Sequence, residues 1–132
     1  LGRELDLLDV VQIKEALVDL QKFISVPVIV VHSRYWALAY GENAARFSQA
    51  LTGGATLATT RFCYGDEFTV EDYNNIERLA PNKEGARFAE VLKELLGHRI
   101  SCVPVARVDP SNATTIGLGD AFVGGFLAAL LS

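Results

Sequence analysis

The sequence of 132 residues contains no methionine, only two cysteines, and only two histidines. Cys63 and Cys102 lie far apart and form no Cys-x-x-Cys pair, so no recognisable zinc-site spacing is present. We interpret them as two buried thiols in a reducing cytoplasm, with a disulfide or a redox pair as the alternative. Because an initiator methionine is missing, we expect a fragment or a processed chain. Because no signal peptide opens the sequence, we expect the protein to be located in the cytoplasm.

The sequence also lacks a large excess of charge of one sign, and it has no long apolar run. The formal net charge is −4, and the lysines and arginines are scattered along the chain. A nucleic-acid binder needs a basic surface to neutralise phosphates, so nucleic acid is not an expected partner. The longest apolar stretch, residues 121–131, is shorter than the roughly 20 residues that a membrane span needs. A hydrophobic content of 50% instead predicts a soluble globular domain with a packed core.

Helical patterns account for much of the chain. They occupy residues 4–23, 42–61, 83–96 and 121–131. The second segment is rich in alanine and threonine and is interrupted by Gly53-Gly54. Small residues of this kind let a helix approach another element closely. Thr69 with Asp72 resembles a capping box, which predicts a further short helix ending near Leu79.

Two segments are typical of strands. Residues 28–31 form an uninterrupted β-branched run, which suits a strand covered on both faces. Residues 100–108 form the second, in which Pro104 requires an edge or a kink. The order helix, strand, helices, strand, helix favours an α/β layered architecture, with a mostly parallel sheet flanked by helices. We expect the whole chain to form one compact segment.

Residues 114–120, Thr-Thr-Ile-Gly-Leu-Gly-Asp, carry the most informative motif. Gly117 and Gly119 stand where a loop enters the last helix, so successive backbone N–H groups can converge on an anion. The positive end of the helix dipole favours a phosphoryl group at the same place. Asp120 could then accept the proton of an attacking hydroxyl. The alternative is a tight turn in which Asp120 only caps the helix, worth about 1 kcal/mol.

A longer string decides between these interpretations. Residues 115–126, Thr-Ile-Gly-Leu-Gly-Asp-Ala-Phe-Val-Gly-Gly-Phe, closely resemble the signature that closes ribokinase-superfamily sugar kinases. Residues 31–39, Val-His-Ser-Arg-Tyr-Trp-Ala-Leu-Ala, are similar to a segment of ADP-dependent phosphofructokinases and glucokinases, as are residues 41–44. The segment from Val103-Pro104 to Pro110 also resembles that family. The resemblance covers roughly residues 27–132.

The resemblance implies a ribokinase-like (Rossmann-like) fold, of which this chain would be the carboxy-terminal, nucleotide-binding portion of the large domain. The family transfers the β-phosphoryl group of ADP to glucose or fructose 6-phosphate with Mg²⁺. Asp120 would be the catalytic base, beside an anion hole formed by the backbone amides of Gly117, Leu118 and Gly119. The nucleotide phosphates would lie along Thr114, Thr115 and Ile116. The adenine pocket would be walled by Val103, Val105, Val108 and Pro110.

The resemblance is incomplete in two respects. Ala121 replaces the threonine that ADP-dependent members commonly carry, and residues 122–125 are closer to ATP-dependent ribokinase-like enzymes. The family's sugar-binding region, lid and acidic metal motifs have no counterpart here, so the missing amino-terminal part of the same protein is an expected partner. The isolated fragment would be inactive. The alternatives are an ATP-dependent carbohydrate kinase, a non-catalytic nucleotide-binding module, and an α/β domain whose glycine-rich turn serves only packing.

Several further residues have two interpretations each. His32 follows a strand and could touch the nucleotide or be a hydrogen-bonded structural histidine. Arg34 could pair with a phosphate or with a surface carboxylate. Tyr35 and Trp36 could stack on adenine, although core packing is the favoured interpretation.

An acidic cluster could hold Mg²⁺ through water, but a solvated loop and a helix amino terminus explain these charges better: Asp66, Glu67, Glu71 and Asp72. We therefore assign no metal ligand within the chain, and expect Mg²⁺ only in the full-length enzyme.

Overall fold

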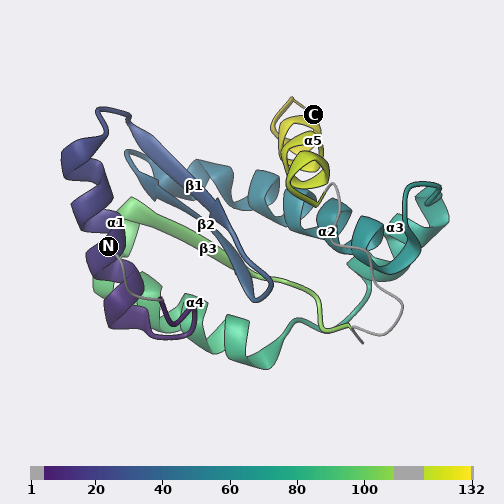
Figure 1. Cartoon of the computed structure of the whole chain (residues 1–132), viewed down its shortest axis with the longest axis horizontal. Helices are drawn as coiled ribbons and strands as arrows, with labels where there is room; N and C mark the ends of the chain where they lie inside the picture. Colours follow the sequence, from purple (N-terminus) through teal and green to yellow (C-terminus); the bar gives the residue numbers. More distant parts are fainter. Residues whose placement is uncertain (1–4, 109–117, 132) are drawn as a thin grey trace.

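The computed structural model describes residues 5–108 and 118–131 (Figure 1). The helices in these ranges are α1 (Val10–Phe23), α2 (Ser48–Tyr64), α3 (Val70–Glu77), α4 (Lys83–Leu96) and α5 (Leu118–Leu131). The strands are β1 (Val28–His32), β2 (Trp36–Gly41) and β3 (Ile100–Pro104). Two short 3₁₀ turns, η1 (Ala44–Phe47) and η2 (Gly97–Arg99), precede α2 and β3. The α/β class is therefore confirmed.

The sheet is antiparallel, with the strand order β1-β2-β3, so the predicted mostly parallel sheet is wrong for the described residues. The prediction did not include the strand β2. Only a tight turn separates it from β1, and His32 pairs with Ala37 across the hairpin. Parallel strands need a crossover of a dozen or more residues, which such a turn does not provide. The apolar run in β1 forms an outer strand of this sheet.

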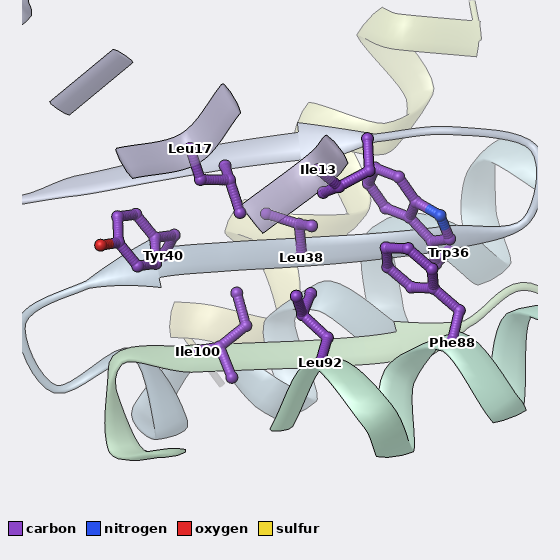
Figure 2. Close-up of a cluster of buried hydrophobic side chains, with 8 residues drawn as sticks. All are labelled: Ile13, Leu17, Trp36, Leu38, Tyr40, Phe88, Leu92 and Ile100. Atoms are coloured by element: carbon purple, nitrogen blue, oxygen red, sulfur yellow. The ribbon is translucent and has the colours of Figure 1, made fainter. Parts of the chain in front are cut away.

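β2 is buried along its whole length and separates two different packing layers. Successive side chains of a strand point to opposite faces, and here the large ones all share one face. Figure 2 shows them meeting side chains from α1, α4 and β3 in one cluster: Ile13, Leu17, Trp36, Leu38, Tyr40, Phe88, Leu92 and Ile100. Trp36 stacks on Phe88 with ring centroids 5.1 Å apart. This cluster is the main core of the chain.

The opposite face of β2 carries only Ala37 and Ala39, which leave room for α2 and α5. Figure 1 shows α5 (yellow) crossing over α2 on this side of the sheet. A Cβ atom added at Gly54 would lie 2.7 Å from the carbonyl oxygen of Phe122. The close approach predicted for the small residues is therefore confirmed. The predicted interruption at Gly53-Gly54 is wrong, because α2 is continuous through both glycines.

Local signals placed the other helices well. Thr69 Oγ1 accepts a hydrogen bond from the Asp72 N–H at 3.1 Å, and the Asp72 carboxylate accepts one from the Thr69 N–H at 2.9 Å. This confirms the capping box at the start of α3. α4 has the predicted bounds, whereas α1 begins at Val10, after Asp9 caps it. None of the helices in the described ranges has the length and apolar character needed to cross a membrane.

The predicted second strand ends earlier than expected, at Pro104. Beyond this residue the chain leaves β2 and pairs with the segment that precedes α4. The Asn82 N–H donates to the Val105 carbonyl at 2.8 Å, and the Arg107 N–H donates to the Ala80 carbonyl at 2.9 Å. This change of partner turns residues 105–108 away from the sheet and toward the carboxyl-terminal half of α2.

Candidate functional site

A cavity of about 620 Å³ opens where three parts of the chain meet beside Asn82, which precedes α4. These parts are the hairpin tip between β1 and β2, the second half of α2, and the segment that follows β3. The lining residues are His32, Ser33, Arg34, Tyr35, Ala58, Thr59, Phe62, Asn82, Val105, Ala106 and Val108. Apolar walls with a few hydrogen-bonding groups are typical of sites for planar small molecules.

Hydrogen bonds of backbone and side-chain groups hold these walls together. The Val105 N–H donates to the Tyr35 carbonyl at 2.9 Å, which ties the segment after β3 to the hairpin tip. The Ser33 hydroxyl donates to the Trp36 carbonyl at 3.0 Å and accepts from the Trp36 N–H at 3.2 Å. Asn82 caps α4 by accepting from the Gly85 N–H at 3.0 Å. These hydrogen bonds fix the positions of the hairpin tip, the segment after β3 and the beginning of α4.

His32 lies at the end of β1 and forms one edge of the cavity. Its ring stacks on Phe122 of α5, with centroids 4.5 Å apart and an interplanar angle of 9°. Burial lowers the pKa of the His32 imidazole, so the neutral ring predominates at pH 7. Because Phe122 is near the beginning of α5, this contact brings the amino end of that helix to the His32 side of the cavity.

The structure brings together four of the residues predicted to bind the nucleotide: His32, Arg34, Val105 and Val108. Val103 is half-buried and packs against the cluster on the α2 side of the sheet instead. Pro110, Thr114, Thr115, Ile116 and Gly117 lie outside the described residues. Leu118, Gly119 and Asp120 form the first turn of α5, and their side chains lie outside the description. The roles assigned to these residues remain predictions.

Sequence reasoning did not assign several of the lining residues to a site. Asn82 directly precedes the helical pattern of residues 83–96, and Ala58 and Thr59 belong to a helix interpreted as packing against another element. Phe62 carried no signal of its own. Ala58, Thr59 and Phe62 line the cavity because α2 passes behind the hairpin, and Asn82 does so because its N–H bonds to the Val105 carbonyl. No local pattern encodes either arrangement.

The aromatic pair after β1 divides between core and cavity. Trp36 is 1% exposed, and its Nε1–H donates to the Leu7 carbonyl at 2.7 Å, which confirms the core interpretation. Tyr35 is half-buried and lines the cavity. The exposed Arg34 guanidinium lies 4.9 Å from the centroid of the Tyr35 ring. A stacked cation of this kind is available for an anionic ligand at the cavity mouth.

The acidic residues after α2 have structural roles. Asp72 closes the capping box of α3, and Asp66 forms an ion pair with Arg61. In the described parts of the chain, no three histidine, cysteine, aspartate or glutamate side chains gather as metal ligands. These residues do not fit a Mg²⁺ site, and we derive no step through that ion.

The two cysteines are free thiols, each half-buried. Burial raises the pKa of Cys63, and it raises the pKa of Cys102 to about 12. A thiol with a raised pKa stays protonated at neutral pH, and the thiolate is the reactive form. Neither residue is therefore suited to nucleophilic chemistry, and the disulfide between them is wrong.

The stacked histidine predicts a pH dependence of stability. The unfolded chain protonates His32 below about pH 6.5, whereas burial lowers the pKa of the same group in the folded chain. The contribution of neutral His32 to the free energy of unfolding is fully present above about pH 6.5. It falls as the pH drops from the pKa of the unfolded chain toward the lower pKa of the folded chain. Urea unfolding between about pH 7 and pH 5 should show a shallower loss for His32→Phe, which cannot titrate. Parallel curves for both proteins would contradict this prediction.

Comparison with known proteins shows which solved structures share the fold of this chain. No protein-family model matches the sequence, and no curated protein matches it at a significant level. The structure matches a phosphofructokinase from Pyrococcus horikoshii OT3, solved with AMP, with a TM-score of 0.72 and 21% identity. That match covers 91% of this chain and 29% of the other.

Two further solved structures agree. The last common ancestor of ADP-dependent phosphofructokinases from Methanosarcinales matches with a TM-score of 0.72 and 17% identity, over 97% of this chain and 31% of that one. An ADP-dependent kinase solved with fructose-6-phosphate and ADPβS matches with a TM-score of 0.71 and 17% identity. It covers 97% of this chain and 33% of that chain.

The chain therefore has the fold of a segment of the ADP-dependent phosphofructokinases, which confirms the resemblance at the level of the fold. It spans about a third of the length of the chains that it matches.

Proposed function

We propose that this chain is the nucleotide-binding part of an ADP-dependent sugar kinase. The observation that carries the proposal is the cavity enclosed by the hairpin tip, α2 and the segment after β3, within a fold shared with such kinases. The adenine ring would lie between the apolar walls, which include Val105 and Val108. Pro110 would extend that wall. Val103 would support it from the cluster on the α2 side of the sheet. Asn82 and Thr59 offer hydrogen-bonding groups that could orient the base.

The phosphates would extend from the cavity toward the beginning of α5. His32, which stacks on α5, and Arg34 at the hairpin tip lie on the path that the phosphates would take. Thr114, Thr115 and Ile116 would line the phosphates farther along. The backbone amides of Gly117, Leu118 and Gly119 would hold the transferring group at the positive end of the helix dipole.

The proposed chemistry is an in-line phosphoryl transfer. A hydroxyl oxygen of glucose or fructose 6-phosphate attacks the β-phosphorus of ADP, the bond from that phosphorus to the AMP oxygen breaks, and AMP leaves. Asp120 accepts the hydroxyl proton as the new P–O bond forms. Charge that develops on the phosphoryl oxygens would be stabilised by these backbone amides at the amino end of α5. A sugar-binding region outside this sequence would supply the acceptor, so the isolated chain should bind nucleotide without turning it over.

Calorimetry with AMP, ADP and ATP tests the binding step on the chain itself. We expect one nucleotide per chain, with ADP and AMP favoured over ATP. Val108→Trp fills the cavity and should weaken AMP binding about tenfold or more, equivalent to at least 1.4 kcal/mol. Val91→Trp is the matched control, because Val91 lies on α4 outside the cavity and is 38% exposed. A chain that binds no nucleotide would exclude the proposal, and preferential binding of ATP would favour an ATP-dependent ribokinase-like enzyme.

A non-catalytic nucleotide-binding module is the second candidate. It uses the same cavity but assigns no chemistry to Asp120. The two candidates differ once the sugar-binding region is supplied. Nucleotide binding without phosphorylation of either sugar would then favour the module.

A further inference from the structure

The contact between His32 and Phe122 joins the wall of the cavity to the last helix. His32 belongs to the cavity lining, and the ring of Phe122 is 5% exposed within α5. Their rings lie nearly parallel, with centroids 4.5 Å apart. The two residues are distant in the sequence, so the stack is a tertiary contact between the end of β1 and the beginning of α5.

Phe122 also packs closely against α2. A Cβ atom at Gly54 would lie 2.7 Å from the Phe122 carbonyl oxygen and 2.8 Å from its ring. Phe122 therefore lies between Gly54 of α2, which leaves no space for a displacement toward that helix, and the imidazole of His32 at the end of β1. Among the described elements, α5 packs chiefly on α2, so His32 provides a separate contact from the sheet.

We propose that His32 is a positioning residue that couples occupation of the cavity to the placement of the amino end of α5. The inference rests on the proposed function, because the first turn of α5 contains Leu118, Gly119 and Asp120. A nucleotide that contacts the imidazole restricts the hairpin tip and the histidine ring together. The stacked Phe122 is restricted in turn, and with it the helix end that would hold the phosphoryl group. Binding equilibria are reciprocal, so a well-placed α5 also strengthens nucleotide binding.

The neutral state of His32 suits this role. Burial lowers the pKa of the imidazole, so near pH 7 one ring nitrogen donates and the other accepts. Such a ring can form a hydrogen bond with a ligand at its edge while its face stays on Phe122. Arg34 is the charged residue that shares the cavity lining, and it lies over Tyr35 rather than over the imidazole.

Amide hydrogen exchange with and without AMP tests the coupling. In the unmodified chain, saturating AMP should slow exchange in α5 by about 5-fold or more, the lower range of typical coupling between sites. In His32→Ala this AMP-dependent protection of α5 should be lost, while residues 105–108 at the cavity remain protected. His32→Phe restores the stacked ring and should restore the protection. If His32→Ala does not fold, His32→Leu serves in its place, because it fills space without stacking.

Phe88→Leu is the matched control. It removes another stacked pair of rings, Trp36 with Phe88, on the face of the sheet away from α5. This variant should exchange faster throughout but keep the AMP-dependent protection of α5.

Each remaining outcome contradicts a distinct claim. A His32→Ala chain whose α5 exchanges faster but keeps its response to AMP would show a merely structural contact and overturn the coupling. An unmodified chain that binds AMP without protection of α5 would also overturn it, and would leave the proposed nucleotide site intact. Absence of AMP binding by calorimetry would overturn both.

Discussion

Asp120→Asn is expected to lower turnover of the kinase that contains this chain by about 10²–10⁴-fold, the usual contribution of a positioned general base. The amide is nearly the same size as the carboxylate but cannot accept the proton of the attacking hydroxyl. The affinity for ADP should change little, because the proposed contacts to the nucleotide come from the cavity walls and from backbone amides. Steady-state phosphorylation of glucose and fructose 6-phosphate, together with ADP titration calorimetry, separates the two effects.

Asp66→Asn provides the control for this comparison. Asp66 is exposed, forms an ion pair with Arg61, and lies outside the cavity lining. Its replacement should leave turnover unchanged. Full activity of Asp120→Asn would show that the carboxylate is not the catalytic base. It would favour the interpretation in which Asp120 only caps the helix.

Gly125→Ala should lower the free energy of unfolding by about 1–3 kcal/mol, the usual cost of overpacking a tight contact. A Cβ atom at this position would lie 2.5 Å from the Gly53 carbonyl oxygen and 2.8 Å from the Leu57 Cβ. The Gly53 oxygen belongs to the backbone of α2, so it cannot rotate away. The helices must separate, which also loosens the stack of His32 on Phe122. Urea denaturation measures the loss directly.

The neighbouring glycine should respond in the opposite direction. A Cβ atom at Gly124 meets only the Leu57 Cδ2 atom at 3.8 Å, an ordinary van der Waals distance. Gly124→Ala should therefore stabilise the chain by about 0.5–1 kcal/mol, because alanine loses less conformational freedom in a helix. Equal effects of the two substitutions would mean that α2 and α5 do not cross at these residues.

Most helices follow from short-range chemistry that can be read along the chain. α4 is amphipathic between Asn82, which caps its amino end, and Gly97, which adopts a φ of 58° after its last turn. α3 begins at the capping box of Thr69 and Asp72. In these cases the hydrogen-bonding partners lie within a few residues, so local composition is sufficient.

β2 was missed for a physical reason. Its sequence, Trp-Ala-Leu-Ala-Tyr-Gly, alternates large and small apolar residues and shows no polar face. Both faces are buried because α1 and α4 cover one side and α2 covers the other. With the strand unrecognised, the two remaining strands were separated by helices, which favoured a parallel arrangement. The antiparallel sheet depends on a hairpin whose second strand has no signature apart from its packing.

The amino-acid sequence alone determines most of the helices and the caps of α3 and α4, because each depends on neighbours close along the chain. The sheet and the cavity depend on the tertiary structure. The residues around that cavity come from the hairpin tip, α2, the segment before α4 and the segment after β3, and long loops must close before they meet. Their proximity results from the packing of α2 and α5 behind β2, which no local pattern specifies.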